Sequence, residues 1–201
     1  MPMKSWKSAI ALLVLAVPAL SGCVTPVGPV EVTRFHLPDT SALGKGTISV
    51  VPGPGANGAS LEWKSYQAAV ARQLVLLGYT EAPAGDGAQL AELRLSRETF
   101  RPERRTGPVS VGLGGSTGSY GSGVGLGVGI NLSGRPPEQV RTELAVTIKD
   151  RVTSAALWEG RASFTVKTSS PLAATSLGAP KMAEALFVNF PGISGETIEV
   201  K

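Results

Sequence analysis

Two stretches of the sequence decide the fold: QVRTELAVTIK at positions 139–149 and ALWEGRASFTVK at positions 156–167. Apolar and polar residues alternate along both, which is the period of a β-strand that buries one face. The inward positions are Val140, Thr142, Leu144, Val146 and Ile148 in the first, and Trp158, Ala162, Phe164 and Val166 in the second. Because a turn at 150–155 joins them, the two strands are predicted to form an antiparallel hairpin with one face in water.

Further strands are predicted at 30–37, 47–51 and 88–100, and a helix is predicted over 60–77. Ser60 suits the N-cap of this helix and Gly78 its C′ position. Its apolar stripe consists of Trp63, Tyr66, Val70, Leu74 and Leu77. A second helix is predicted to begin with Pro180 at its N1 position and to end at Pro191-Gly192, after an extra turn at Pro171. An edge strand at 196–201 completes the pattern.

This order of elements predicts an α+β fold. Strands lie clustered between helices, and each strand has one apolar face. We therefore expect an antiparallel β-sheet of about five strands, with two helices packed on one face and a Gly-rich β-hairpin insertion. The predicted organisation is one domain at 30–201, with the insertion at 107–134.

The N-terminus has the pattern of a bacterial lipoprotein signal. Lys4 and Lys7 precede an apolar run at 10–17, which is too short to span a bilayer of roughly 30 Å. Leu20-Ser21-Gly22-Cys23 matches the lipobox at every position. We expect cleavage between Gly22 and Cys23, which removes residues 1–22, and a diacylglyceryl group on the sulfur of Cys23.

A short lipidated tether at 23–29 would then hold the domain close to a membrane. Three acyl chains, palmitate among them, would anchor the chain stably. In the enterobacterial sorting pattern an aspartate after the cysteine retains a lipoprotein in the inner membrane. Val24 stands there instead, so we expect the outer membrane, facing the periplasm.

Composition narrows the choice of partners. The chain has 19 basic and 15 acidic side chains, and its only cysteine is Cys23. Without Lys4 and Lys7 the excess of positive charge is small, and no nucleic-acid partner is expected. With its sulfur alkylated, Cys23 leaves the domain without a disulfide, so a core must stabilise it.

The Gly-rich segment alternates aliphatic residues with glycine. Two arms, at 109–114 and 124–132, are predicted to be joined by a flexible tip and to extend the strands near 100 and 140. Three interpretations stay open: a disordered loop, a hairpin packed on its own domain, or a contact surface for a partner or membrane. The candidate contact residues are Val124, Leu126, Val128, Ile130 and Tyr120.

Arginines are expected to bracket the base of this hairpin: Arg97, Arg101, Arg104, Arg105 and Arg135. Guanidinium groups suit phosphate, so contact with anionic lipid is one interpretation and a solvated basic loop is the other.

The sequence shows no evident cluster of residues suited to catalysis or metal binding. His36 is the only histidine and is predicted to be structural, and the carboxylates are scattered singly. No Gly-x-Ser-x-Gly elbow with a downstream Asp and His occurs. We expect no catalytic residue, metal or cofactor. A site built from two carboxylates brought together by folding stays open.

The assembled motifs resemble bacterial outer-membrane lipoproteins of domain-of-unknown-function family 4136. The resemblance is carried by Leu144–Asp150, by Leu157-Trp158-Glu159-Gly160-Arg161-Ala162 and by Phe190-Pro191, together with the lipobox and a helix ending in Leu77-Gly78-Tyr79. The first strand matches less clearly, and the chain continues past Phe-Pro. The resemblance implies a small periplasmic α+β domain with no established activity.

The expected function is therefore a non-enzymatic role in binding or assembly, with the outer membrane reached through the lipid anchor and an envelope protein as a candidate partner. One alternative is a subunit of an envelope assembly or transport machine that uses the Gly-rich hairpin as its contact surface. The other is a periplasmic carboxylate-based hydrolase.

Overall fold

A computed structural model describes residues 28–103, 109–118, 121–130 and 134–201, with the backbone alone for 109–130. The predicted signal peptide, Cys23, most of the tether, Arg104, Arg105 and Tyr120 lie outside these residues. Within them, no helix is long and apolar enough to cross a membrane.

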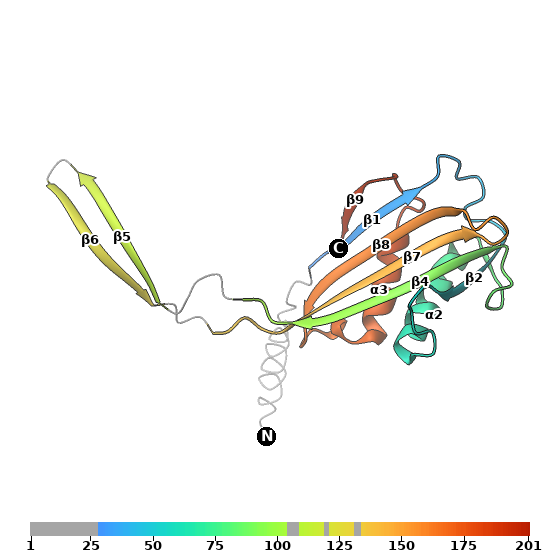
Figure 1. The fold of residues 1–201 in the computed structure, drawn as a ribbon, viewed down its shortest axis with the longest axis horizontal. Coiled ribbons are helices and arrows are strands. Elements are labelled where there is room, and N and C mark those ends of the chain that lie inside the picture. Colours follow the sequence, from blue (N-terminus) through green and yellow to red (C-terminus); the bar gives the residue numbers. More distant parts are fainter. Residues whose placement is uncertain (1–27, 104–108, 119–120, 131–133) are drawn as a thin grey trace, which may run out of the picture.

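The fold is α+β, as predicted, with one large sheet (Figure 1). The sheet order is β3-β2-β4-β7-β8-β1-β9. The strands are β1 (Val30–His36), β2 (Thr47–Pro52), β3 (Thr80–Glu81), β4 (Gln89–Phe100), β7 (Gln139–Asp150), β8 (Ala156–Lys167) and β9 (Thr197–Val200). Helices α2 (Leu61–Leu76) and α3 (Thr175–Phe187) pack on one face, behind the strands in Figure 1.

The sheet differs from the predicted one in size and in direction. It has seven strands rather than about five, because the two-residue β3 and the edge strand β9 also pair. It is mixed rather than antiparallel, because β2 runs parallel to both β3 and β4. A parallel pair needs a long crossover connection, and α2 supplies it between β2 and β4.

Helix α2 follows its local signals closely. The Ser60 side chain accepts a hydrogen bond from the backbone N–H of Trp63, and Gly78 has a positive φ of 103° just after the C-cap Leu77. Trp63, Tyr66, Val70 and Leu74 are buried, and Leu77 packs at the edge of the core. The predicted stripe is confirmed as the core face of the helix.

Helix α3 begins five residues before the predicted start, so Pro180 lies inside it and not at N1. The extension is held by packing: a Cβ at Gly178 would lie 2.8 Å from the carbonyl oxygen of Leu172, in the 3₁₀ turn Pro171–Ala173 (η2). Pro180 and Ser176 are exposed. The carbonyl four residues before the proline, which loses its helical donor, therefore lies at the surface.

A buried arginine meets the C-terminal end of α3. Arg34 is 4% exposed, and its Nε and Nη2 atoms donate to the carbonyl oxygens of Leu186 and Ala185 at 3.1 and 3.3 Å. Carbonyls in the last turn of a helix carry partial negative charge, so they offset the burial of the cation. Burial nevertheless lowers the pKa of Arg34, and Glu196 opposes that shift.

The core lies between the helices and the inner face of the sheet. Trp158 is fully buried there and stacks on Phe187, with ring centroids 5.4 Å apart, and it also contacts Phe190. Its indole N–H donates to the carbonyl of Pro191 at 3.0 Å. The Leu-Trp-x-Gly and Phe-Pro motifs therefore meet in one aromatic cluster.

The Gly-rich segment forms a two-stranded sheet of its own, β5 (Val109–Gly118) and β6 (Gly121–Ile130). The predicted hairpin is present, and its pairing continues to Gly118 and Gly121, through much of the predicted tip. It does not extend β4 and β7 as predicted, because the ladder between those strands ends at Phe100 and Gln139.

Candidate functional site

The five arginines expected at the base of the hairpin do not form one cluster in the described residues. Arg97 points toward the helices, where Nη1 donates to Glu62 at 2.6 Å and to the Thr175 hydroxyl at 3.0 Å, and Nη2 donates to the Ala173 carbonyl. Arg97 thus lies on the inner side of β4, with its guanidinium held by Glu62 and by the segment before α3. Contact of Arg97 with anionic lipid stays a prediction.

The other described arginines, Arg101 and Arg135, lie at the surface. Arg101 lies 3.8 Å from the carboxylate of Glu138, and both side chains are exposed. Arg135 is exposed as well. With Arg104 and Arg105 outside the described residues, contact with anionic lipid stays a prediction.

His36 joins two backbone segments. Its Nδ1 atom lies 2.7 Å from the Leu37 carbonyl oxygen and its Nε2 atom 3.2 Å from that of Gly192. The ring thus links the end of β1 to the loop before β9.

The candidate contact residues of the hairpin fall in a regular register. Val111 pairs with Val128, Leu113 with Leu126 and Val109 with Ile130, while Gly112 pairs with Gly127. Aliphatic positions of both strands therefore share one face, and glycine positions share the other.

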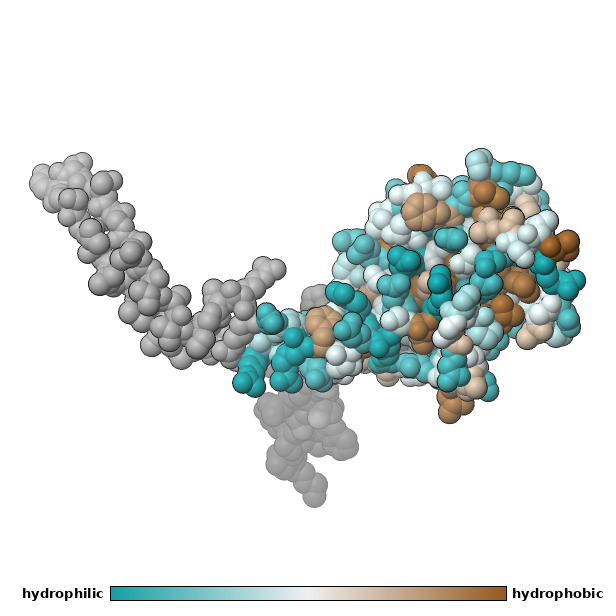
Figure 2. Space-filling view, in the orientation of Figure 1, coloured by the Kyte–Doolittle hydropathy of each residue, from teal (hydrophilic) through white to brown (hydrophobic). Residues whose placement is uncertain are grey.

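Polar residues form ordered cross-strand rows on the outer face of the large sheet, the face opposite the helices. Figure 2 shows this face toward the viewer, with hydrophilic side chains over the strands. One cross-strand row runs through Arg94, Ala145, Arg161 and Thr33, since each pairs with the next across β4, β7, β8 and β1. The next row contains Ser96, Glu143 and Ser163.

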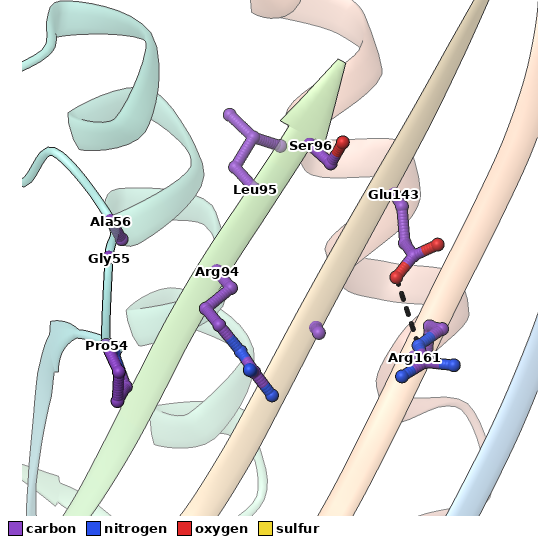
Figure 3. Close-up of a pocket in the computed structure, with 9 residues that line it drawn as sticks. Pro54, Gly55, Ala56, Arg94, Leu95, Ser96, Glu143 and Arg161 are labelled. Carbon is purple, nitrogen blue, oxygen red and sulfur yellow. Dashed lines mark ion pairs between the residues drawn. The ribbon is translucent and has the colours of Figure 1, made fainter. Parts of the chain in front are cut away.

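A hollow of about 320 Å³ lies over β4 and β7 on this face. Figure 3 shows Arg94 pointing from β4 across β7, and the loop at 54–56 bordering the other side. The lining residues are Pro54, Gly55, Ala56, Arg94, Leu95, Ser96, Glu143, Ala145 and Arg161. A second hollow of about 90 Å³ shares Arg94, Ala145 and Arg161 with the first, and adds Phe35 and Glu159.

The stem of Arg94 is held by close packing against Gly53. A Cβ at Gly53 would lie 2.7 Å from Cγ of Arg94, so only glycine leaves room for this approach. The buried Gly53 is itself tied to β4 by a hydrogen bond from its N–H to the Leu93 carbonyl at 2.9 Å. The loop after β2 therefore directs the guanidinium over the sheet.

Arg161 is oriented by a carboxylate. Its Nε atom lies 3.0 Å from Oε1 of Glu143, the ion pair drawn in Figure 3. The nearby Glu92 is paired in the same way, with Nζ of Lys149 at 2.8 Å. These carboxylates are thus neutralised by basic neighbours on the same face.

Carboxyl groups whose pKa is shifted lie in turns, away from this face. Hydrogen bonds from Thr153 and Val152 lower the pKa of Asp150, and hydrogen bonds from Ser41 lower that of Asp39. No group of three or more His, Cys, Asp or Glu residues suited to a metal occurs in the described part of the chain.

Strand alternation puts Arg94 and Arg161 on the polar side of their strands, but it does not by itself bring the two residues together. Only the register across β4, β7 and β8 sets both beside Ala145. The small side chain of Ala145, which leaves space between the two arginines, is a signal in the sequence. It can be recognised only when the register of the three strands is known.

Comparison with known proteins gives few relatives. No family model matches the chain, so the resemblance to family 4136 stays a prediction. A protein of Zymomonas mobilis subsp. mobilis, "Uncharacterized protein ZMO1243", is 29% identical over 218 residues, which cover 86% of this chain and 80% of that protein.

Two solved structures have a distant likeness. A PDZ domain protein from Parabacteroides distasonis is 13% identical with a TM-score of 0.46; the match covers 86% of this chain but only 39% of that one. The PelC dodecamer from Paraburkholderia phytofirmans is 14% identical with a TM-score of 0.39, over 78% of this chain and 96% of that one. Neither likeness is close enough to carry an argument about this chain.

Proposed function

We propose that this chain is a lipid-anchored protein of the bacterial envelope, whose domain binds a ligand or partner at the periplasmic face of the outer membrane. The observation that carries the proposal is the lipobox at 20–23, followed at Val30 by the first strand of the domain. At about 3.5 Å per residue, the tether reaches little more than 20 Å. The domain would therefore work next to the membrane surface.

Binding is favoured over hydrolysis by the state of the carboxylates on the outer face. A glycosidase of the two-carboxylate type needs one carboxyl group that stays protonated to act as the acid. Glu92 lies 2.8 Å from Nζ of Lys149 and Glu143 lies 3.0 Å from Nε of Arg161, so each carboxylate is paired with a basic side chain and not with the other carboxylate. Such pairs suit the recognition of a ligand better than proton transfer to it.

The anchor is tested by mass spectrometry of the protein purified from membranes. We expect a mature chain that begins at Cys23 and carries a diacylglyceryl group, and we expect Cys23→Ser to accumulate as an unprocessed precursor. Val24→Asp is the matched variant: in an enterobacterial host it should keep the lipid but move to the inner membrane. An intact Met1 on the native protein, or a free thiol at Cys23, would overturn the proposal.

A second function, as a subunit of an envelope assembly, is favoured by the register of the β5–β6 hairpin. Three aliphatic pairs follow one another, Val109 with Ile130, Val111 with Val128 and Leu113 with Leu126, and no charged residue occurs between 106 and 134. An apolar face of this kind is an aggregation hazard unless something covers it. A protein partner would provide that cover.

Chemical crosslinking followed by purification tests this second function. We expect a partner that co-purifies with the wild-type chain and is lost with Leu113→Ser combined with Leu126→Ser, a pair on the aliphatic face. The control is Gly112→Ser combined with Gly127→Ser, a facing pair on the glycine side. Equal loss of the partner in both variants would argue against recognition through the aliphatic face.

A further inference from the structure

The row Arg94–Ala145–Arg161 places two guanidinium groups on either side of a small residue. Adjacent strands lie about 4.8 Å apart, so the Cα atoms of the two arginines are roughly 10 Å apart across β7. Ala145 lines both hollows of this face, as do the two arginines. The space above Ala145 is therefore open, and a cation borders it on each side.

Both guanidinium groups have donors available toward this space. Within the described ranges no hydrogen bond or ion pair joins the side chain of Arg94 to another residue, and the ion pair of Arg161 with Glu143 uses the Nε atom. The acidic groups that face the hollows are Glu143 and Glu159. Glu143 lines the first hollow and Glu159 the second, and both arginines line each hollow, so basic side chains outnumber acidic ones two to one in each lining.

Two converging arginine forks are suited to a carboxylate, which accepts parallel N–H···O bonds. Around them, the hydroxyl of Ser96 and the carboxylate of Glu143 can exchange hydrogen bonds with hydroxyl groups. The side chains of Pro54 and Ala56 border the hollow with apolar surface. A carboxylate, several hydroxyl groups and an apolar ring face occur together in a uronic acid.

We propose that this hollow binds a uronate unit of an acidic saccharide, with its carboxylate above Ala145 between Arg94 and Arg161. The hollow lies at the lower end of the range of ligand-site volumes, which suits one short segment of such a chain. The inference deepens the proposed binding function and rests on it. The packing of Arg94 against Gly53 and the Arg161–Glu143 pair orient the two side chains before the ligand arrives.

Isothermal titration calorimetry on the purified full-length protein in detergent tests the proposal, with trigalacturonate as the probe. We expect binding of trigalacturonate and at least tenfold weaker binding of neutral maltotriose and of inorganic phosphate. Arg94→Gln and Arg161→Gln should each weaken trigalacturonate binding about tenfold or more, because each removes charge-assisted hydrogen bonds. Ala145→Leu should do the same by filling the space between the arginines.

The matched control is Arg72→Gln, which removes an exposed arginine from α2 on the other side of the sheet. It should leave the affinity unchanged, and thermal unfolding should show that all variants remain folded. The site is overturned if trigalacturonate does not bind, if phosphate binds equally well, or if Arg72→Gln weakens binding as much as Arg94→Gln. If trigalacturonate does not bind but Cys23 is lipidated, the saccharide site is wrong and the lipid anchor stands. If trigalacturonate binds but Cys23 carries a free thiol, the anchor is wrong and the saccharide site stands.

Discussion

Tyr66 is the residue whose burial most directly ties stability to pH. It is 1% exposed, and its hydroxyl donates to the sulfur of Met182 at 4.0 Å. Burial raises the pKa of Tyr66 to about 12, with a smaller opposing effect from Arg97. The folded protein therefore keeps a proton that the unfolded chain releases from pH 10 upward. This contribution is fully present below pH 10 and is lost as the pH rises toward 12.

We predict that Tyr66→Phe flattens the loss of stability above pH 10. Two pKa units correspond to about 2.7 kcal/mol, which the variant should no longer lose between pH 10 and pH 12. Urea unfolding at pH 8, 10 and 11 measures the effect. Tyr79, whose pKa burial also raises, should leave a residual slope in the variant. A decline as steep as that of the wild type would show that Tyr66 ionises without opening the core.

At the scale of elements, strand β8 fits α3 because Gly160 leaves room for an indole ring. A Cβ on Gly160 would fall onto the Trp158 ring, which is fixed by Pro191 and by two phenylalanines. This packing gives a physical reason for the Trp-x-Gly spacing. The tryptophan folds back along its own strand, and the residue two positions on must lack a side chain.

We predict that Gly160→Ala destabilises the protein by about 2 kcal/mol or more, because an overfilled core forces the ring or the strand to shift. Gly134→Ala is the control, since nothing lies within 4 Å of its added Cβ and its stability should change little. Urea unfolding gives both values. In the background Trp158→Phe, the cost of Gly160→Ala should fall; an unchanged cost would place the strain elsewhere.

At the scale of the whole molecule, the sheet has one face that is buried under helices and one face on which we propose that ligand binds. Helices α2 and α3 cover the inner face and leave the outer face of the sheet free of helices (Figure 1). β1 begins shortly after the predicted lipidated cysteine and lies next to β8 in the sheet. A tether of this length would place the outer face within reach of material at the membrane surface.

Local sequence signals predicted most of the helices and strands, but they predicted little of how these elements pair in the sheet. The bounds of α2 follow from Ser60 and Gly78, which act within one turn of the helix end. The start of α3 was predicted five residues late, because Pro180 is an N1 signal that packing of Gly178 against Leu172 overrides. The parallel pairing of β2 with β4 carries no mark in either strand, since it depends on the crossover through α2.

The candidate site was likewise predictable only in part from the sequence. Alternation alone placed Arg94 and Arg161 on the polar side, but their meeting over Ala145 needs the register of three strands.

By itself, the amino-acid sequence determined the α+β class, the long β7–β8 hairpin and the buried stripe of α2, because periodicity and caps act between near neighbours. The tertiary structure alone decided the strand order, the pairing of Arg97 with Glu62, and the row that joins Arg94 to Arg161. Each of these depends on residues far apart in the chain, whose distances are set only when the strands pair and the core closes.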